Sequence, residues 1–434
     1  MLRLFAVAVA LLIAGTAEAQ SAAVTLPDGR ECLPPPERIT PTDAPIRVDL
    51  IEIRGLHRTR QEVVLRELPF AAGDNVDAQL WSFALTRLWN CTLFDQVDGH
   101  LERDLATGQV RVVIELGETW TLNPLFSFAF GGSAGWARVG ASDNNIAGRF
   151  LELGAQYERF NEHNGFQFWA RDPRFLGKRL DWVVLVERLV RPRPLFADRR
   201  LRISSEVFGL FRSDRVKVSG RLEGLYDVLL PVDGGPDNDA PRNWSMLVEG
   251  AVRLGRLDTV RLRTSGASLE VRSTYVATRL ATLGGHAQGW VEGLAHVMLG
   301  ERWNLSTRVQ LGMQGNAPDY QRFWLGGLQH IRGYVDNYAR TDRFALINAE
   351  ARWIAFDSKW FALMAAAFVD AAVTHDTERG TRAMVSTGIG GRGLLPWMVR
   401  TGMRVDLALP LVDGPCKSGA ALCPGLSVGV YQFF

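Results

Sequence analysis

The feature that most constrains this chain is a strict alternation of apolar and polar side chains that recurs from residue 125 onwards. In 305–313 the odd-numbered positions are apolar or threonine and the even-numbered ones carry Ser, Arg, Gln and Gly; 345–353 and 399–407 alternate similarly. Successive side chains of a β-strand point to opposite faces, so this period predicts strands with one apolar face. Alternation alone does not separate a soluble sandwich from a membrane barrel.

Three further features favour a membrane barrel. The candidate strands run to about 8–14 residues, enough to cross a bilayer when tilted. Short and long polar connections alternate along the chain, as periplasmic turns and external loops do in such barrels. Many strands begin or end in aromatic residues that would lie at the membrane interfaces, namely Trp182, Trp244, Trp303, Trp353, Trp360 and Trp397. We count sixteen candidate strands between 125 and 434.

The N-terminus predicts export. Arg3 precedes a short apolar run, and Ala17, Glu18 and Ala19 fit a cleavage site, so residues 1–19 are expected to be a signal peptide. No later segment contains 18 consecutive apolar residues, so the sequence predicts no membrane-spanning helix. The charges nearly balance, with 49 Lys+Arg against 47 Asp+Glu, and no basic run predicts a nucleic-acid partner.

A short α/β unit precedes the alternating segments. Residues 20–45 form a proline-rich linker, and 46–118 follow the order strand, helix, helix, strand, strand. Thr59, with Glu62 three residues later, has the spacing of a capping box for the first helix, and Asn75 or Asp77 is expected to begin the second.

An exported α/β unit followed by sixteen strands resembles the BamA/TamA-type outer-membrane assembly factors and their relatives, the two-partner-secretion transporters. The most specific element is Ile331, Arg332, Gly333 and Tyr334, preceded by Leu-Gly-Gly at 325–327, which resembles the family's (V/I)RG(Y/F) motif in the sixth external loop. Phe368 and Asp370 resemble its F-x-D motif on strand thirteen, and Glu350 a second acidic position. The terminal aromatic Phe434 resembles an outer-membrane insertion signal.

The resemblance implies an α+β POTRA-like domain over 46–118, followed by a 16-stranded antiparallel transmembrane β-barrel over 123–434. It also implies that Arg332, in loop 6 (residues 315–342), meets Glu350, Phe368 and Asp370 inside the barrel. Strand parity independently turns these three side chains inward. Arg340, in the same loop but outside the motif, is expected to matter little. One POTRA-like unit is a departure, because the family usually has several.

The expected function is outer-membrane protein assembly, insertion or polypeptide translocation, with two-partner secretion of a single polypeptide as the alternative and a passive porin less favoured. The expected location is the bacterial outer membrane, with the N-terminal domain in the periplasm. The expected partners are outer-membrane lipids and unfolded polypeptide clients of the POTRA-like domain, and no nucleic acid. We expect no enzyme activity, cofactor or metal. The glycines of 388–393 fit a nucleotide fingerprint but lie in a strand, where they more readily make room for a bulky neighbour.

The four cysteines suggest two disulfides, because export favours oxidation. Cys416 and Cys423 fall in the predicted eighth external loop and are expected to pair. Cys32 and Cys91 are a second candidate pair, which would join the linker to the second helix of the α/β unit.

Overall fold

The computed structural model describes residues 24–25, 31–32, 36–91, 93–131, 134–212, 214–231, 240–260, 263–278, 284–327, 329–358, 360–395, 401–412, 414 and 425–432. The chain divides into two compact units, Met1–Thr119 and Trp120–Phe434. The predicted signal peptide, Cys416, Cys423 and Phe434 lie outside the described residues, as does the side chain of Cys32. Those predictions therefore stay predictions.

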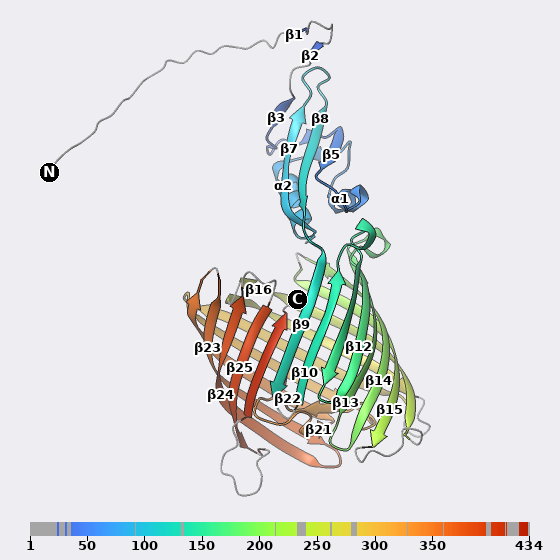
Figure 1. Ribbon diagram of the computed structural model, residues 1–434, viewed down its shortest axis with the longest axis vertical. Coiled ribbons are helices and arrows are strands. Elements are labelled where there is room, and N and C mark those ends of the chain that lie inside the picture. Colours follow the sequence, from blue (N-terminus) through green and yellow to red (C-terminus); the bar gives the residue numbers. More distant parts are fainter. Residues whose placement is uncertain are drawn as a thin grey trace, which may run out of the picture. The chain divides into compact units, whose positions relative to one another are not determined.

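The N-terminal unit is a mixed sheet with two helices. Its elements are β1 (Val24–Thr25), β2 (Glu31–Cys32), β3 (Glu37–Ile39), β4 (Ile46–Arg47), β5 (Leu50–Arg54), α1 (Gln61–Glu67), β6 (Asn75–Val76), α2 (Ala78–Trp89), β7 (Phe94–Arg103) and β8 (Val110–Glu118). The main sheet has the order β3-β7-β8-β5, and β5 runs parallel to β8 (Figure 1). Trp81 of α2 lies over Gly99 of β7, where an added Cβ would be 2.9 Å from the indole ring.

Of the two predicted helix starts, that of α2 is confirmed and that of α1 is wrong. Asp77 begins α2 as expected, because its carboxylate accepts a hydrogen bond from the backbone N–H of Leu80 at 2.7 Å. The capping box at Thr59 is wrong. The N-cap of α1 is Arg60, without a side-chain cap bond, and Thr59 is turned instead towards Glu118, which accepts its backbone N–H at 2.6 Å.

The second unit is a closed antiparallel barrel of sixteen strands, as predicted (Figure 1). They are β9 (Leu122–Gly131), β10 (Ala134–Asp143), β11 (Glu152–Phe160), β12 (His163–Asp172), β13 (Leu180–Pro192), β14 (Phe196–Phe211), β15 (Val216–Pro231), β16 (Arg242–Val260), β17 (Arg263–Thr278), β18 (His286–Leu299), β19 (Trp303–Gln314), β22 (Arg343–Asp357), β23 (Ala362–Asp376), β24 (Gly380–Leu395), β25 (Thr401–Val412) and β26 (Gly425–Gln432). Two single-turn 3₁₀ helices, η1 (Ile146–Gly148) and η2 (Phe175–Gly177), occupy connections.

The barrel is apolar outside and polar inside. On β22 and β23 the outward Ile347 and Val369 are 44% and 49% exposed, whereas the inward Asp370 is fully buried. A soluble barrel would bury its apolar face, so this polarity is that of a barrel whose outer surface faces lipid. Among the described residues, no helix has the length and hydropathy of a membrane span.

We call the end of the barrel at which β9 begins the proximal mouth and the opposite end the distal mouth. Loop 6 leaves the distal end of β19 and contains two short strands, β20 (Phe323–Leu325) and β21 (Ala339–Thr341), which pair with each other. The barrel closes where β26 meets β9 (Figure 1). In the described residues this seam has three paired positions, Phe128, Ala129 and Phe130 opposite Val430, Gly429 and Val428.

Candidate functional site

Loop 6 folds back into the lumen around an apolar cluster. Leu325, Ile331 and Tyr334 are almost completely buried against Leu346 and Met384 of the barrel wall. Removing such side chains from water stabilises a packed loop over a solvated one. The apolar cluster therefore helps to order loop 6, which the charged residues of the loop alone would not do.

Arg332 is the polar centre of this site. Its Nε and Nη2 donate to the two carboxylate oxygens of Asp370, each at 2.6 Å, and its Nη1 donates to Glu350 at 2.7 Å. Its backbone N–H also donates to Asp370, at 3.1 Å. Arg332 is 4% exposed, so this is a buried, two-pronged ion pair rather than a surface contact.

Four further acid–base contacts extend the pair across the lumen. Glu350 also accepts from Arg352 at 2.7 Å and from Arg392 at 2.9 Å. Arg392 donates in turn to Asp406, at 2.7 Å, and Asp406 is fully buried and also bonds Arg404. The sequence analysis did not single out Arg392, and it treated Asp406 as an inward charge that solvates the lumen, not as part of this site. The parity that placed Glu350 inside could have found both, because each is an inward charge on the two strands that follow β23.

Phe368 and the glycine opposite it shape the pocket for the guanidinium group. The Arg332 guanidinium carbon lies 3.4 Å from the centre of the Phe368 ring, a cation–π distance. Phe368 is paired with Gly388, where an added Cβ would lie 2.4 Å from the ring. The glycine that fits a nucleotide fingerprint thus makes room for an aromatic ring.

The last two motif residues fit loop 6 to an irregular part of the wall. Gly333 has φ +87°, and a Cβ there would lie 3.2 Å from Pro410, so a side chain is excluded by both backbone and space. The register of β24 against β25 shifts between Val385 and Ser386. The Tyr334 hydroxyl accepts the backbone N–H of Val385 at 3.0 Å and also bonds Val412, so it satisfies backbone groups at the bulge.

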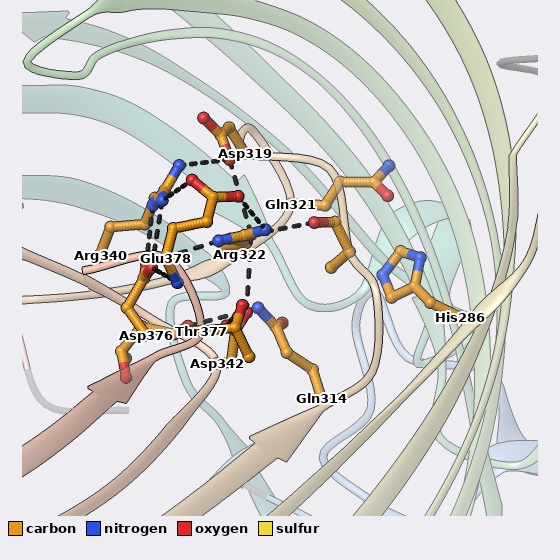
Figure 2. A network of polar contacts seen from close by, with 12 residues as sticks. His286, Gln314, Asp319, Gln321, Arg322, Arg340, Asp342, Asp376, Thr377 and Glu378 are labelled. Atoms are coloured by element: carbon orange, nitrogen blue, oxygen red, sulfur yellow. Dashed lines mark hydrogen bonds and ion pairs between the residues drawn. The ribbon is translucent and has the colours of Figure 1, made fainter. Parts of the chain in front are cut away.

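A second network, which we call the rim network, holds the outer part of loop 6. Arg340 bonds Asp376 at 2.8 Å, Glu378 at 2.6 Å and Asp319 at 2.6 Å, and Arg322 bonds Glu378 at 3.1 Å. Figure 2 shows the Glu378 carboxylate between the two guanidinium groups. Hydrogen bonding by Arg340 lowers the pKa of Glu378, which therefore stays ionised. The network joins loop 6 to the turn between β23 and β24.

The contacts of Arg340 argue against the expectation that this residue matters little. Its side chain is 5% exposed and contacts three carboxylates, of which Asp376 is buried and Asp319 and Glu378 are exposed. The physical reason is that β21 places Arg340 over Asp376, the last residue of β23. No alternation extends into loop 6, so sequence parity could not indicate this contact.

Cys91, the cysteine whose side chain is described, lies in the N-terminal unit. The Cys91 thiol donates to the Arg87 carbonyl at 3.3 Å, at the end of α2. Its pairing with Cys32 remains a prediction because that side chain is not described.

Comparisons with known proteins agree with this architecture. Residues 212–415 match the Omp85 superfamily domain. BamA from Haemophilus ducreyi lacking POTRA domains 1–3 is similar in structure, with a TM-score of 0.68 and 17% identity over 88% of this chain and 84% of that one. CdiB from Acinetobacter baumannii has a TM-score of 0.61 and 15% identity over 89% and 74%, and CdiB from Escherichia coli 0.62 and 14% over 88% and 76%. No curated protein matches the chain. At these identities the structural likeness concerns the fold.

Proposed function

We propose that this chain is a non-enzymatic factor that inserts polypeptides into the bacterial outer membrane. The match to the Omp85 superfamily domain and the fold of the BamA/TamA-type superfamily support this proposal. The N-terminal unit of the chain, on this proposal a POTRA domain, lies in the periplasm. Unfolded outer-membrane proteins are its clients, and the lipids of that membrane surround its barrel.

The short seam is the observation that carries this proposal. Three paired positions join β26 to β9 in the described residues, whereas β9 and β10, the next pair along the wall, share ten, and β10 and β11 share eight. Fewer main-chain hydrogen bonds hold this junction, and each open strand edge is a template for another strand. A client strand could therefore pair with β9 when the seam separates.

Capture of the client is assigned to the N-terminal sheet. β5 forms one end of the order β3-β7-β8-β5, so its outer edge can accept an added strand through main-chain hydrogen bonds. Such binding makes few demands on sequence, as a factor with many clients requires. Photo-crosslinking from Ile51, the second residue of β5, in cells should trap unfolded barrel proteins.

A disulfide across the seam tests insertion directly. Ala129 and Gly429 are opposite one another, so the pair Ala129→Cys and Gly429→Cys should form a bond that locks the seam. Insertion of a client barrel into liposomes should be lost under oxidation and restored by reductant. Val139→Cys with Tyr157→Cys, a matched pair within the β10–β11 junction, should have no effect. Full insertion with the seam locked would contradict the proposal.

Export of one polypeptide through the lumen, as in two-partner secretion, is the second candidate. The two CdiB structures favour it as a fold analogy. Export through the lumen should survive the seam disulfide, and crosslinking should then trap a single large secreted protein instead of many barrel proteins.

A further inference from the structure

The hairpin of β16 and β17 continues past its neighbours at the proximal mouth. β15 pairs with β16 as far as Leu254, and β18 pairs with β17 from Gly266 onwards. β16 and β17 nevertheless stay paired with each other out to Val260 and Arg263. We call this extension, residues 255–260 and 263–266, the proximal ribbon.

Two glycines with left-handed backbone lie at the base of the ribbon. Gly255 has φ +94° and Gly266 has φ +108°, and each lies two positions from the other's partner across the hairpin. A Cβ at Gly255 would lie 2.1 Å from the Ala267 carbonyl oxygen, and one at Gly266 2.3 Å from that of Arg256. Only glycine fits both places, so the sequence allows the two strands to bend together at one level.

The bend turns the ribbon inward across the lumen. Arg263 bonds Asp357 of β22 at 2.5 Å, although β18 and β19 lie between their strands. Three strand spacings along the wall amount to about 14 Å, so the two charges meet because the ribbon leaves the wall. Asn304, fully buried on β19, donates to the Thr264 carbonyl at 2.6 Å and makes a second contact across the same mouth.

A cavity lies beneath the ribbon. It measures about 390 Å³ and is lined by Arg256 and Asp258 of the ribbon and by Glu270, Glu292 and Leu294 of the wall. Leu294 also lines the adjoining cavity that contains Arg332. Because the two cavities share Leu294, the space under the ribbon leads towards the loop 6 site.

We propose that the proximal ribbon is a gate over the lumen, hinged at Gly255 and Gly266 and held closed by the Arg263–Asp357 pair and the Asn304–Thr264 hydrogen bond. In the closed position it keeps an extended polypeptide away from the charged lumen. The Arg263 side chain is 37% exposed, so water and salt weaken the pair and the gate can open. This gate is independent of the seam and of any particular client.

The test measures access to the lumen in the full-length chain. The four native cysteines are replaced by serine, Leu294→Cys is introduced, and the folded protein in detergent reacts with a maleimide attached to polyethylene glycol. Arg263→Ala and Asp357→Ala should each speed modification by about two- to fivefold, the effect of losing a partly exposed ion pair. The exchange Arg263→Asp with Asp357→Arg should restore the slow rate.

Arg302→Ala is the matched control, because Arg302 is an exposed arginine at the same mouth, between β18 and β19, and lines neither cavity. Its modification rate should equal that of the parent. Equal rates in the parent, Arg263→Ala and Asp357→Ala would overturn the gate, as would an equal acceleration by Arg302→Ala. Gel mobility of unheated protein checks that each variant is folded.

A crosslink provides a second measurement. Cysteines at 263 and 357, in a chain that keeps Leu294, should be joined by a short bismaleimide crosslinker, because the arginine side chain of the pair separates the two Cα atoms by more than the roughly 7 Å that a disulfide allows. Failure to join would place the ribbon away from the mouth and overturn the proposal. Neither measurement uses a client, so failure of the gate leaves the seam-lock test of insertion unaffected.

Discussion

Arg332→Ala is the substitution with the most informative expected result. It removes the guanidinium that bonds both oxygens of Asp370 and one of Glu350. Asp370 is fully buried, so no water replaces the lost donors unless loop 6 leaves its place. The variant must therefore either keep an unpaired buried carboxylate or release the loop.

The magnitude follows from burial. Breaking one side of a buried ion pair costs roughly 3–5 kcal/mol, because the remaining charge stays desolvated. An exposed pair would contribute only about 0–1 kcal/mol. Arg332 at 4% exposure belongs to the first case. Arg332→Lys should recover only part of the loss, since an ammonium group cannot engage both oxygens of Asp370 in the planar two-pronged geometry.

The assay is denaturant unfolding of the barrel in detergent, followed by gel mobility of unheated samples, together with the client-insertion assay. Arg343→Ala is the control, because Arg343 is exposed at the start of β22. We expect a loss of stability and of insertion in Arg332→Ala and neither in Arg343→Ala. A change in unfolding free energy below about 1 kcal/mol would show that the carboxylates are hydrated and would refute the reasoning.

Three further results are expected. Arg340→Ala should destabilise the barrel and expose the outer part of loop 6 to protease, because it removes a cation shared by three carboxylates; unchanged cleavage would contradict this. Gly388→Ala should cost about 1–3 kcal/mol by crowding the ring opposite it, whereas Gly391→Ala, with open space at its Cβ, should be neutral in the same unfolding assay. Burial raises the pKa of Glu118, but hydrogen bonds from Thr59 and neighbouring backbone lower it by more. The ionised carboxylate therefore stabilises the fold fully at pH values above 4.5, its ordinary pKa. The protection of residues 57–59 from hydrogen exchange should fall as the pH drops through the lowered pKa. In Glu118→Gln this protection should depend little on pH.

Period-2 alternation determines how much of this structure could be predicted. It was enough for the sixteen strands and for the inward direction of Glu350 and Asp370, because parity in a strand is fixed by backbone geometry. It was silent in loop 6, where the apolar cluster and the contacts of Arg340 come from tertiary packing. The error at Thr59 has a similar cause: its backbone bonds a carboxylate 59 residues away in sequence, and this contact competed with the local capping signal.

The bend at the proximal mouth shows what pattern reading omits inside a strand. Gly255 and Gly266 interrupt the alternation without ending the hairpin, because β16 and β17 stay paired across the bend. The bend can be predicted only from the register that brings the two glycines to the same level of the hairpin. This register is known only once the turn is known.

The two mouths of the barrel are closed by interactions of different strength. Loop 6 is held at the distal side by the buried ion pairs of Arg332, by the buried Arg340–Asp376 pair and by an apolar cluster, all of which are costly to break. The proximal ribbon is held by one partly exposed ion pair and one hydrogen bond. Added salt weakens the exposed pair and scarcely affects the buried ones. The proximal side should therefore open first, and a polypeptide that entered the lumen would still meet loop 6, which leaves the seam between β26 and β9 as the weaker exit.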